Sequence, residues 1–213
     1  MTALERKEKT EAYLKGLDIP INPWLPVIEE EADTIIRTAE DIAKRIIILV
    51  YLGGYAEEGD RREIVDFLQS EALWDSVSDY EKELLSKRRL TEKDKIKISW
   101  QSENIYLLLW AINKIDLLDL PIEHCNIGEM FDLLPGPFEP TRDYIQNATV
   151  RSKPEILDKS DLIYRLHWAA REANLRNQDI PGDIDIEILQ EWHYAINWVT
   201  YYNDDWDDIQ TDT

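Results

Sequence analysis

The spacing of apolar residues restricts the fold of this chain more than any other feature, because it follows the helical period almost throughout. From Glu29 to Leu52 an apolar stripe recurs at steps of three and four residues: Ile35, Ala39, Ile42, Ile46 and Val50. Similar stripes occupy residues 99–115, 161–175 and 183–199, and no segment alternates in the manner of a strand. The chain has 213 residues, enough to bury a sizeable core. The pattern predicts an all-α protein with a single, multi-helix, bundle-like domain over residues 1–213.

Helix boundaries can be placed from caps and breakers. Capping boxes at Ser78–Glu81 and Thr91–Asp94 predict two helix starts, and Asp183 is expected to cap the last helix. Gly53 and Gly54 are expected to end the helix that begins near Glu29.

Three segments are expected to lie outside the regular helices of the bundle. Residues 1–20 predict an N-terminal arm, helical from Thr2 to Lys15, that packs on its own subunit or forms a homodimer with another. In the following INPWLP stretch, prolines hold the chain extended and Trp24 is expected to pack on the core. Residues 120–150 are rich in proline and predict an irregular excursion, and residues 203–213 form an acidic tail.

Charge and cysteine content limit the environment and the partners. The chain carries 24 basic and 44 acidic residues, a net charge of -20, so nucleic acid and anionic membranes would be repelled. A basic protein or cations would be attracted, although acidity can also serve solubility alone. The single cysteine, Cys125, excludes an intrachain disulfide, and the charged N-terminal residues do not resemble a secretion signal. The longest apolar run, 46–54, is too short to span a membrane, so we expect a cytoplasmic protein.

Common catalytic motifs are absent. The sequence contains no glycine-rich phosphate loop, GxSxG or HExxH motif, and one cysteine cannot build a structural zinc site. His124 and Cys125 are adjacent and therefore point apart, which disfavours a thiol–imidazole pair. No cofactor is expected.

The C-terminal NDDWDDIQTDT has the appearance of a metal motif but does not satisfy one. An EF-hand loop begun at Asn203 would put Asp208 where glycine is required and would run past Thr213. An aspartate-rich magnesium motif would need a second set of ligands. We expect instead that Trp206 anchors the tail on the last helix while the aspartates stay solvated.

One polar constellation remains as a candidate site, which we name the histidine seam. His167 and His193 lie on different predicted helices, each about 140° from the centre of its apolar stripe. Arg171 and Asn197 follow one turn later, and Glu103 could approach from the 99–115 helix. The hypothetical binding residues are Glu103, His167, Trp168, Arg171, Trp192, His193 and Asn197. His167, His193 and Glu103 are also candidate metal ligands, but half-buried polar residues of this kind can equally be structural.

Several segments resemble a known family across nearly the whole chain. They are GLDIPINPWLPVIE, SWQSENIYLLLWAI, EILDKSDLIYRLHWAAREA, EWHYAINWV and DDWDDIQTDT, and in this order they resemble the domain of unknown function 4272 family. The family is bacterial and implies no particular activity. The resembling segments include Glu103, His167, Arg171, His193, Asn197 and the Trp206 tail, as a shared core would also require.

Two functions follow as hypotheses. The first is an acidic helical interaction protein that binds a basic protein, as bacterial immunity proteins that neutralise toxin domains do. The alternative is a small-ligand or metal-dependent enzyme that uses the histidine seam. Binding is favoured over catalysis because the motifs of common enzymes are missing.

Overall fold

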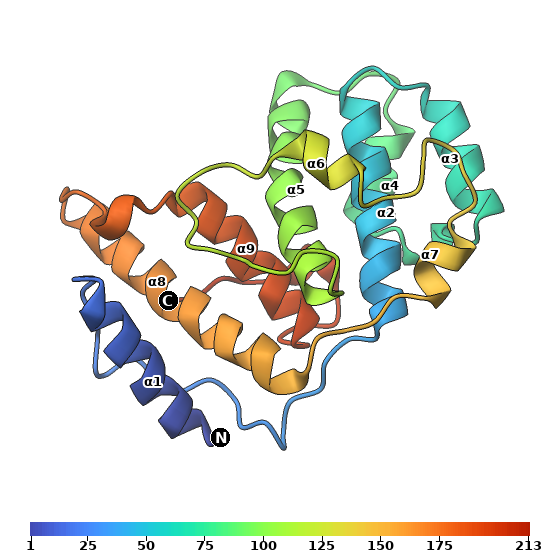
Figure 1. Cartoon of the computed structure of the whole chain (residues 1–213). Helices are drawn as coiled ribbons and strands as arrows, with labels where there is room; N and C mark the ends of the chain where they lie inside the picture. The colour runs from blue at the N-terminus through green and yellow to red at the C-terminus, as the bar shows by residue number, and fades with distance from the viewer.

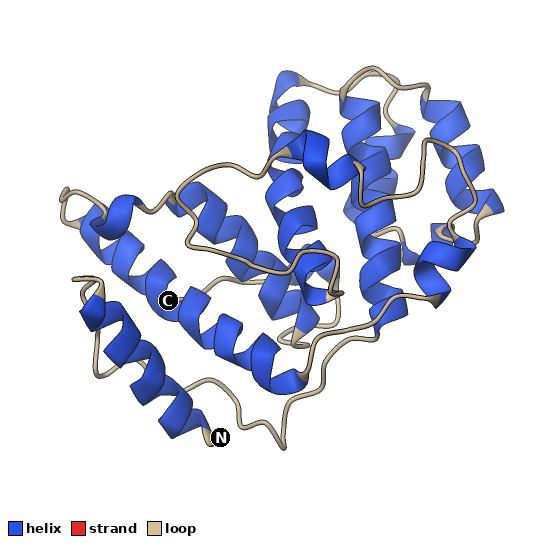
Figure 2. Ribbon diagram, viewed as in Figure 1, coloured by secondary structure: helices blue, strands red, loops and turns tan.

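The computed structural model describes residues 1–213 and is entirely helical, which confirms the predicted fold class (Figure 2). The α-helices are α1 (Ala3–Gly16), α2 (Ala39–Ala56), α3 (Arg61–Ser70), α4 (Asp79–Ser86), α5 (Glu92–Ala111), α6 (Ile127–Phe131), α7 (Arg142–Gln146), α8 (Lys153–Leu175) and α9 (Ile186–Val199). Three short 3₁₀ helices are η1 (Trp74–Ser76), η2 (Pro181–Asp183) and η3 (Trp206–Asp208). None of the helices combines the length and the apolar character that crossing a bilayer requires.

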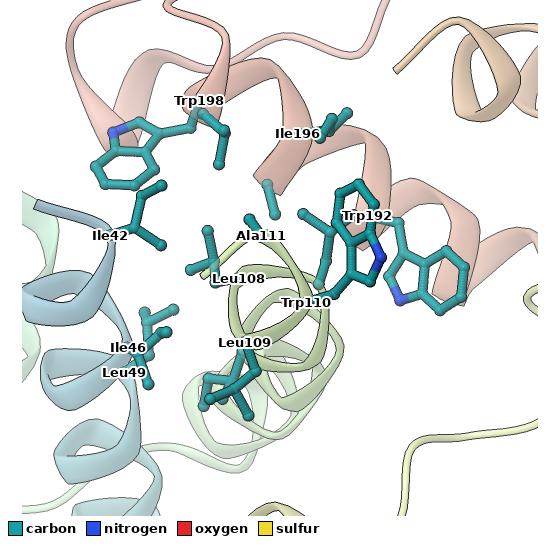
Figure 3. Close-up of a cluster of buried hydrophobic side chains, with 14 of the residues drawn as sticks. Ile42, Ile46, Leu49, Leu108, Leu109, Trp110, Ala111, Trp192, Ile196 and Trp198 are labelled. Carbon is teal, nitrogen blue, oxygen red and sulfur yellow. The ribbon is translucent and has the colours of Figure 1, made fainter. Parts of the chain in front are cut away.

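The longer helices pack in a row in which chain order is not followed. α2 packs on α5, α5 on α9, α9 on α8, and α8 on α1 (Figure 1). Side chains of α2, α5 and α9 meet in the core, where Ile46 of α2 and Leu108 of α5 lie in the same cluster as Ile196 of α9 (Figure 3). The row therefore places α9 between α5 and α8, with polar residues of both neighbours against it.

Helix α2 differs from its prediction at both ends. It begins at Ala39 and not near Glu29. Thr38 caps this start, because its side chain accepts a hydrogen bond from the Asp41 amide. The preceding residues form a turn at 31–33 followed by irregular backbone, to which Lys153 is bound by donating to the carbonyl groups of Glu31 and Thr34. Ile35, which fits the helical stripe, is 69% exposed.

The two glycines of α2 were expected to end the helix and do not. Gly53 and Gly54 lie inside it, and a Cβ at either position would meet open space. Glycine costs only about 1 kcal/mol relative to alanine in a helix. Burial of Leu52 and Tyr55 on either side offsets that cost and carries the helix on to Ala56.

The N-terminal arm is helical, as predicted, and packs within its own chain. α1 lies along α8, where Arg6 Nε and Lys9 Nζ both contact the Asp158 carboxylate, at 2.9 and 2.6 Å. This face of α1 is therefore not free for a second subunit. A homodimer through the arm would need its outer face, where Leu4 and Tyr13 are exposed.

Trp24 does not pack on the core. Its side chain is 90% exposed, whereas the next residue, Leu25, is buried and fixes the turn. Lys7 Nζ donates to the carbonyl groups of Pro23 and Leu25, which pins the same turn to α1. The apolar residue that anchors this segment is thus Leu25, and the indole is left in solvent.

The predicted helix starts are correct at two of three places. Both capping boxes are present, at Ser78 for α4 and at Thr91 for α5. Helix α9 is capped by Asp185, whose side chain accepts from the amides of Glu187 and Ile188, and not by Asp183. Asp183 instead closes η2, directly after a turn in which Gly182 has φ 72°.

Candidate functional site

The structure brings the two histidines of the seam into direct contact. His167 on α8 and His193 on α9 face each other across the packed helices, and their Nδ1 atoms lie 2.7 Å apart. The rings meet edge to face, and both side chains are buried. A hydrogen bond between two Nδ1 atoms requires one ring to donate and the other to accept. One proton therefore lies between the two Nδ1 atoms.

Burial keeps both imidazoles neutral at physiological pH. Desolvation, with a smaller contribution from the nearby Arg171 cation, lowers the pKa of His167 to about 4. Desolvation lowers the pKa of His193 to about 3, helped by the adjacent His167 and by Arg171. Neither ring can act as a cationic group at pH 7 in this environment.

Two other seam residues bind the C-terminal tail. Arg171 Nη1 donates to Thr213 Oγ1 at 3.1 Å, and Asn197 Nδ2 donates to the Gln210 carbonyl at 2.8 Å. Both lie beside the histidine pair on α8 and α9 and fix the tail across it. Their observed contacts are structural.

The tryptophans of the seam lie on two sides of the helix pair. Trp192 stacks with Tyr106 of α5 at a centroid distance of 6.3 Å, and its buried Nε1 has no acceptor. Trp168 is half-buried and lines a surface cavity beside Pro20 and Pro23. They do not form a common wall around the histidines.

Glu103 contacts residues 124 and 125 of the irregular excursion. Its Oε1 accepts from the Cys125 amide at 3.0 Å and lies 3.2 Å from His124 Nδ1, so this carboxylate ties the irregular excursion to α5. No group of three or more His, Cys, Asp or Glu side chains in the structure could hold a metal ion. The proposed set of His167, His193 and Glu103 is therefore not a metal centre.

The thiol of Cys125 lies close to Glu103. Burial, followed by the charge of Glu103, raises the pKa of Cys125 to about 12.

Two cavities flank the row of helices at α9, and Glu191 lines both of them. The first, the His167 cavity, has a volume of about 610 Å³ and lies under the tail; its walls include Trp100, His167, Arg171, Gln190, Glu191 and Thr211. The second, the Glu191 cavity, has a volume of about 310 Å³ and is more enclosed; its walls include Lys97, Gln101, Asn104, Glu191, Tyr194 and Trp206.

Helical spacing explains why these residues share the Glu191 cavity. Lys97, Gln101 and Asn104 are four and three residues apart and so lie on one face of α5. Glu191 and Tyr194 are three apart on α9, which packs against that face. The start of α4 and η3 of the tail close the remaining sides.

Glu191 has the most strongly shifted carboxyl group of the site. Burial raises its pKa to about 7, although a hydrogen bond from Asn104 Nδ2 and the charge of Lys97 oppose the shift. The carboxyl of Glu191 thus changes protonation near neutral pH. Gln101 and Asn104 are buried beside it, and Gln101 Oε1 and Asn104 Oδ1 have no hydrogen-bond donor.

The tail that closes both cavities is anchored as predicted by Trp206, with help from two buried arginines. Trp206 is buried and packs edge to face on Tyr194 and Trp198 of α9. Arg37 Nε donates to the Trp198 carbonyl at 2.7 Å, and its Nη2 donates to two carbonyl groups of the tail. Arg45 lies over the Trp206 ring, with Cζ 4.9 Å from the centroid.

The aspartates of the tail were expected to be solvated, and three of the four between Asn203 and Ile209 are. Asp204, Asp205 and Asp208 are exposed, but Asp207 accepts from Ser78 Oγ at 2.7 Å and from the Tyr80 amide at 2.9 Å. The tail is therefore tied to the first turn of α4 as well as to α9.

Sequence analysis missed Glu191, Gln101 and Asn104. A signal was available: Gln101 and Asn104 interrupt an apolar helix at a spacing of three, and Glu191 lies two residues before the histidine segment HYAINW. These positions could have been grouped only with the knowledge that α5 and α9 are neighbours.

Comparison with known proteins gives a family and no closer relative. Searches of curated proteins and of solved structures found no match. The family model described as Domain of unknown function (DUF4272) matches residues 6–209, which include every residue of the histidine pair and of the Glu191 cavity. The chain therefore belongs to the DUF4272 family.

Proposed function

We propose that this protein is an interaction protein that binds a basic protein partner. The observation that carries the proposal is how the fold divides its charges between interior and surface. Four of the 24 basic residues are buried, as against three of the 44 acidic ones. The surface thus keeps 41 acidic and 20 basic residues, a net charge of -21, slightly more than the whole chain carries.

The buried arginines are withdrawn from this surface because each is bound to carbonyl or carboxylate groups inside the protein. Arg37 binds three backbone carbonyl groups, and Arg165 pairs with Asp161 at 2.9 Å. Arg45 pairs with the buried Glu81. A surface of one sign raises the encounter rate with an oppositely charged protein and makes that rate depend on salt.

Trp24 supports the proposal as a ready anchor for a partner. Tryptophan is enriched among the residues that dominate binding energy at interfaces, and this one is held almost fully exposed. Its turn is fixed by Lys7 and by Arg165, which donates to the Pro26 carbonyl at 3.0 Å. Little conformational entropy would be lost when a partner covers it. Exposed acidic residues, Glu29 and Asp33, follow in the same segment.

In its finer form the proposal makes this an immunity-like protein of the cytoplasm, with a basic toxin domain as partner. The lone cysteine fits a reducing compartment. A toxin gene beside the gene for this protein would support this form, and a metabolic operon would oppose it.

The proposal is tested by affinity capture from native cell extract at about 50 mM and about 500 mM salt, concentrations between which screening of surface charge changes strongly. We expect a basic protein, identified by mass spectrometry, to be retained at low salt and released at high salt. Trp24→Ser should weaken its retention, whereas Ile96→Ser, which removes an exposed apolar side chain from α5, should not. Retention that ignores salt, or the absence of any basic protein at low salt, would contradict the proposal.

A second candidate function is small-ligand binding in the His167 cavity. It is favoured by one observation, that a neutral imidazole and the Glu191 carboxyl line the same space of about 610 Å³. Groups of this kind can exchange protons with a ligand. Thermal shifts with small ligands and with divalent ions, using untagged protein, would test this candidate, and a His167→Gln variant with unchanged shifts would remove it.

A further inference from the structure

Two residues that line the Glu191 cavity, Gln101 and Asn104, carry buried oxygen atoms that have no donor within the chain. Gln101 and Asn104 are at least nine-tenths buried, and the carbonyl oxygen of each amide lacks a hydrogen bond. Leaving a buried acceptor unsatisfied costs about 1–3 kcal/mol for each group. Both residues lie on one face of α5 and line the same cavity, which suggests that a ligand in the cavity supplies the donors.

The neighbouring carboxylates show which acceptors remain available. The only donor to Glu191 is Asn104 Nδ2, so most of its hydrogen-bonding capacity is free. Asp207, in contrast, is occupied by Ser78 and Tyr80, and Glu81 is occupied by Arg45. The free acceptors are therefore the two amide oxygens from α5 and the Glu191 carboxylate from α9.

The remaining walls are aromatic. Trp206, Tyr80 and Tyr194 line the cavity beside the three acceptors. At about 310 Å³ the space is at the lower end of the range for small-ligand sites, about 300–1,000 Å³. A suitable ligand is small, planar, cationic and rich in N–H donors. A guanidinium group meets these conditions, because it presents five donors in a plane and stacks on aromatic rings.

We propose that the Glu191 cavity binds a guanidinium group, and, resting on the function proposed above, that an arginine side chain of the basic partner supplies it. In this complex the group donates to Gln101 Oε1, Asn104 Oδ1 and the Glu191 carboxylate and stacks on the aromatic walls. Lys97 is exposed at the cavity, and its Nζ lies 3.9 Å from the Tyr80 ring centroid. The Lys97 ammonium therefore competes with an incoming cation for this aromatic ring.

Binding should release a proton near neutral pH. The pKa of Glu191 is about 7 in the free protein, so the carboxyl is substantially protonated at pH 6 and largely ionised at pH 8. A bound guanidinium favours the ionised form, which means that affinity rises between pH 6 and pH 8. The other titratable groups of the Glu191 cavity are Lys97 of α5, Tyr80 and Glu81 of α4, Asp207 of the tail and Tyr194 of α9, and Glu103 of α5 acts on Glu191 through its charge. Those that line the His167 cavity with Glu191 are Glu187 of α9, His167 and Arg171 of α8, and Asp212 of the tail.

The experiment is calorimetric titration of the full chain at low salt with three capped amino acids. They are arginine, citrulline, which is a neutral analogue of the same shape, and lysine, which carries a non-planar cation. We expect acetyl-arginine-methylamide to bind at least about tenfold more tightly than either of the others. Citrulline lacks the charge of the guanidinium group, and lysine lacks its planar set of donors. Citrulline binding as tightly as arginine would overturn the proposal.

Variants make the test specific to the cavity. Glu191→Gln should weaken arginine binding at least about tenfold and remove the rise from pH 6 to pH 8. Glu187→Gln removes the same charge from an exposed position one turn earlier on α9 and should leave binding within about twofold. Lys97→Met removes a competing cation and should strengthen binding, a gain that damage to the fold could not produce. Equal effects of Glu191→Gln and Glu187→Gln would refute the proposal.

A last comparison separates the source of the guanidinium and keeps the two proposals distinct. A glycine-rich peptide with one arginine should bind more tightly than the capped amino acid if the ligand is a protein side chain, and equally if it is a small molecule. If arginine binds but no basic partner is captured, the cavity assignment stands and the protein-binding function fails. If a basic partner is captured and Glu191→Gln does not weaken it, the protein-binding function stands and the cavity is not its contact.

Discussion

Replacing His193 with glutamine should make this protein less sensitive to acid, although it removes a buried hydrogen bond. In the unfolded chain the imidazole has its ordinary pKa of 6.5, and in the folded chain the pKa is about 3. Stability from such a lowered histidine is present above pH 6.5 and is lost as the pH falls, because the unfolded state takes up a proton that the folded state rejects.

The size of the effect follows from the cited pKa values. At pH 5 the pH lies about 1.5 units below the pKa of the imidazole in the unfolded chain, which is therefore protonated, while the folded imidazole is still neutral. His193 thus lowers the free energy of unfolding at pH 5 by about 2 kcal/mol relative to neutral pH. His167, with a folded pKa of about 4, costs nearly as much at this pH. Together the pair accounts for about 4 kcal/mol of acid destabilisation between pH 7.5 and pH 5.

Glu191 acts in the opposite direction. Its folded pKa of about 7 lies above the ordinary value of 4.5, so the folded state holds the proton more strongly and this group adds about 2 kcal/mol of stability between pH 7.5 and pH 5. Glu191→Gln should therefore increase the acid loss by about 2 kcal/mol, whereas His193→Gln should reduce it by about the same amount.

The assay is urea unfolding at pH 7.5 and pH 5.0, followed by tryptophan fluorescence, for wild type and both variants. The quantity compared is the difference between the two unfolding free energies of each protein, which removes the constant cost of the lost hydrogen bond. An acid loss in His193→Gln within about 0.5 kcal/mol of wild type would refute the reasoning about the buried pair.

Three further predictions concern other buried groups. Trp206→Ala should lower the free energy of unfolding by about 3–5 kcal/mol because the ring is enclosed by α9 and Arg45, whereas Trp24→Ala, at 90% exposure, should change it by less than about 0.5 kcal/mol. Urea titration measures both, and similar losses would contradict the placement of the two rings. Glu81→Ala should cost about 3–5 kcal/mol because it strands Arg45, and the double variant Arg45→Met/Glu81→Leu should cost less than the single one; a double variant that is less stable would refute this. Cys125, with its pKa near 12 instead of 9, should hold about a thousandfold less thiolate than an ordinary thiol, so iodoacetamide at pH 8 should label it far more slowly in the folded protein than in urea; equal rates would show that the thiol is not shielded.

The helical nature of the chain could be predicted because it is written in local spacing, but the ends of α2 could not. Ile35 extends the stripe of α2 toward the N-terminus, yet its segment is not helical, and the Lys153 side chain binds two of its backbone carbonyl groups. Those contacts come from a residue more than a hundred positions away. No window of local sequence contains that information.

The candidate site was predictable in part for the same reason. His167 and His193 were expected to lie on helix flanks, and they meet because α9 is covered on both sides, so that a flank becomes interior. Glu103 has the right residue type on the right helix, but it turns to the Cys125 amide on a loop whose path no pattern specified. The Glu191 cavity joins four separate parts of the chain, and spacing within one helix could identify only pairs of its residues.

The attachment of the tail also has a consequence for synthesis. Ser78, Tyr80 and Arg45 emerge from the ribosome well over a hundred residues before Asp207 and Trp206, which contact them. Until that late stretch is translated, the nascent chain must expose the indole-binding face of α9 and the first turn of α4. A growing chain of this protein therefore carries an uncovered apolar face from the synthesis of α9 until Trp206 has been translated.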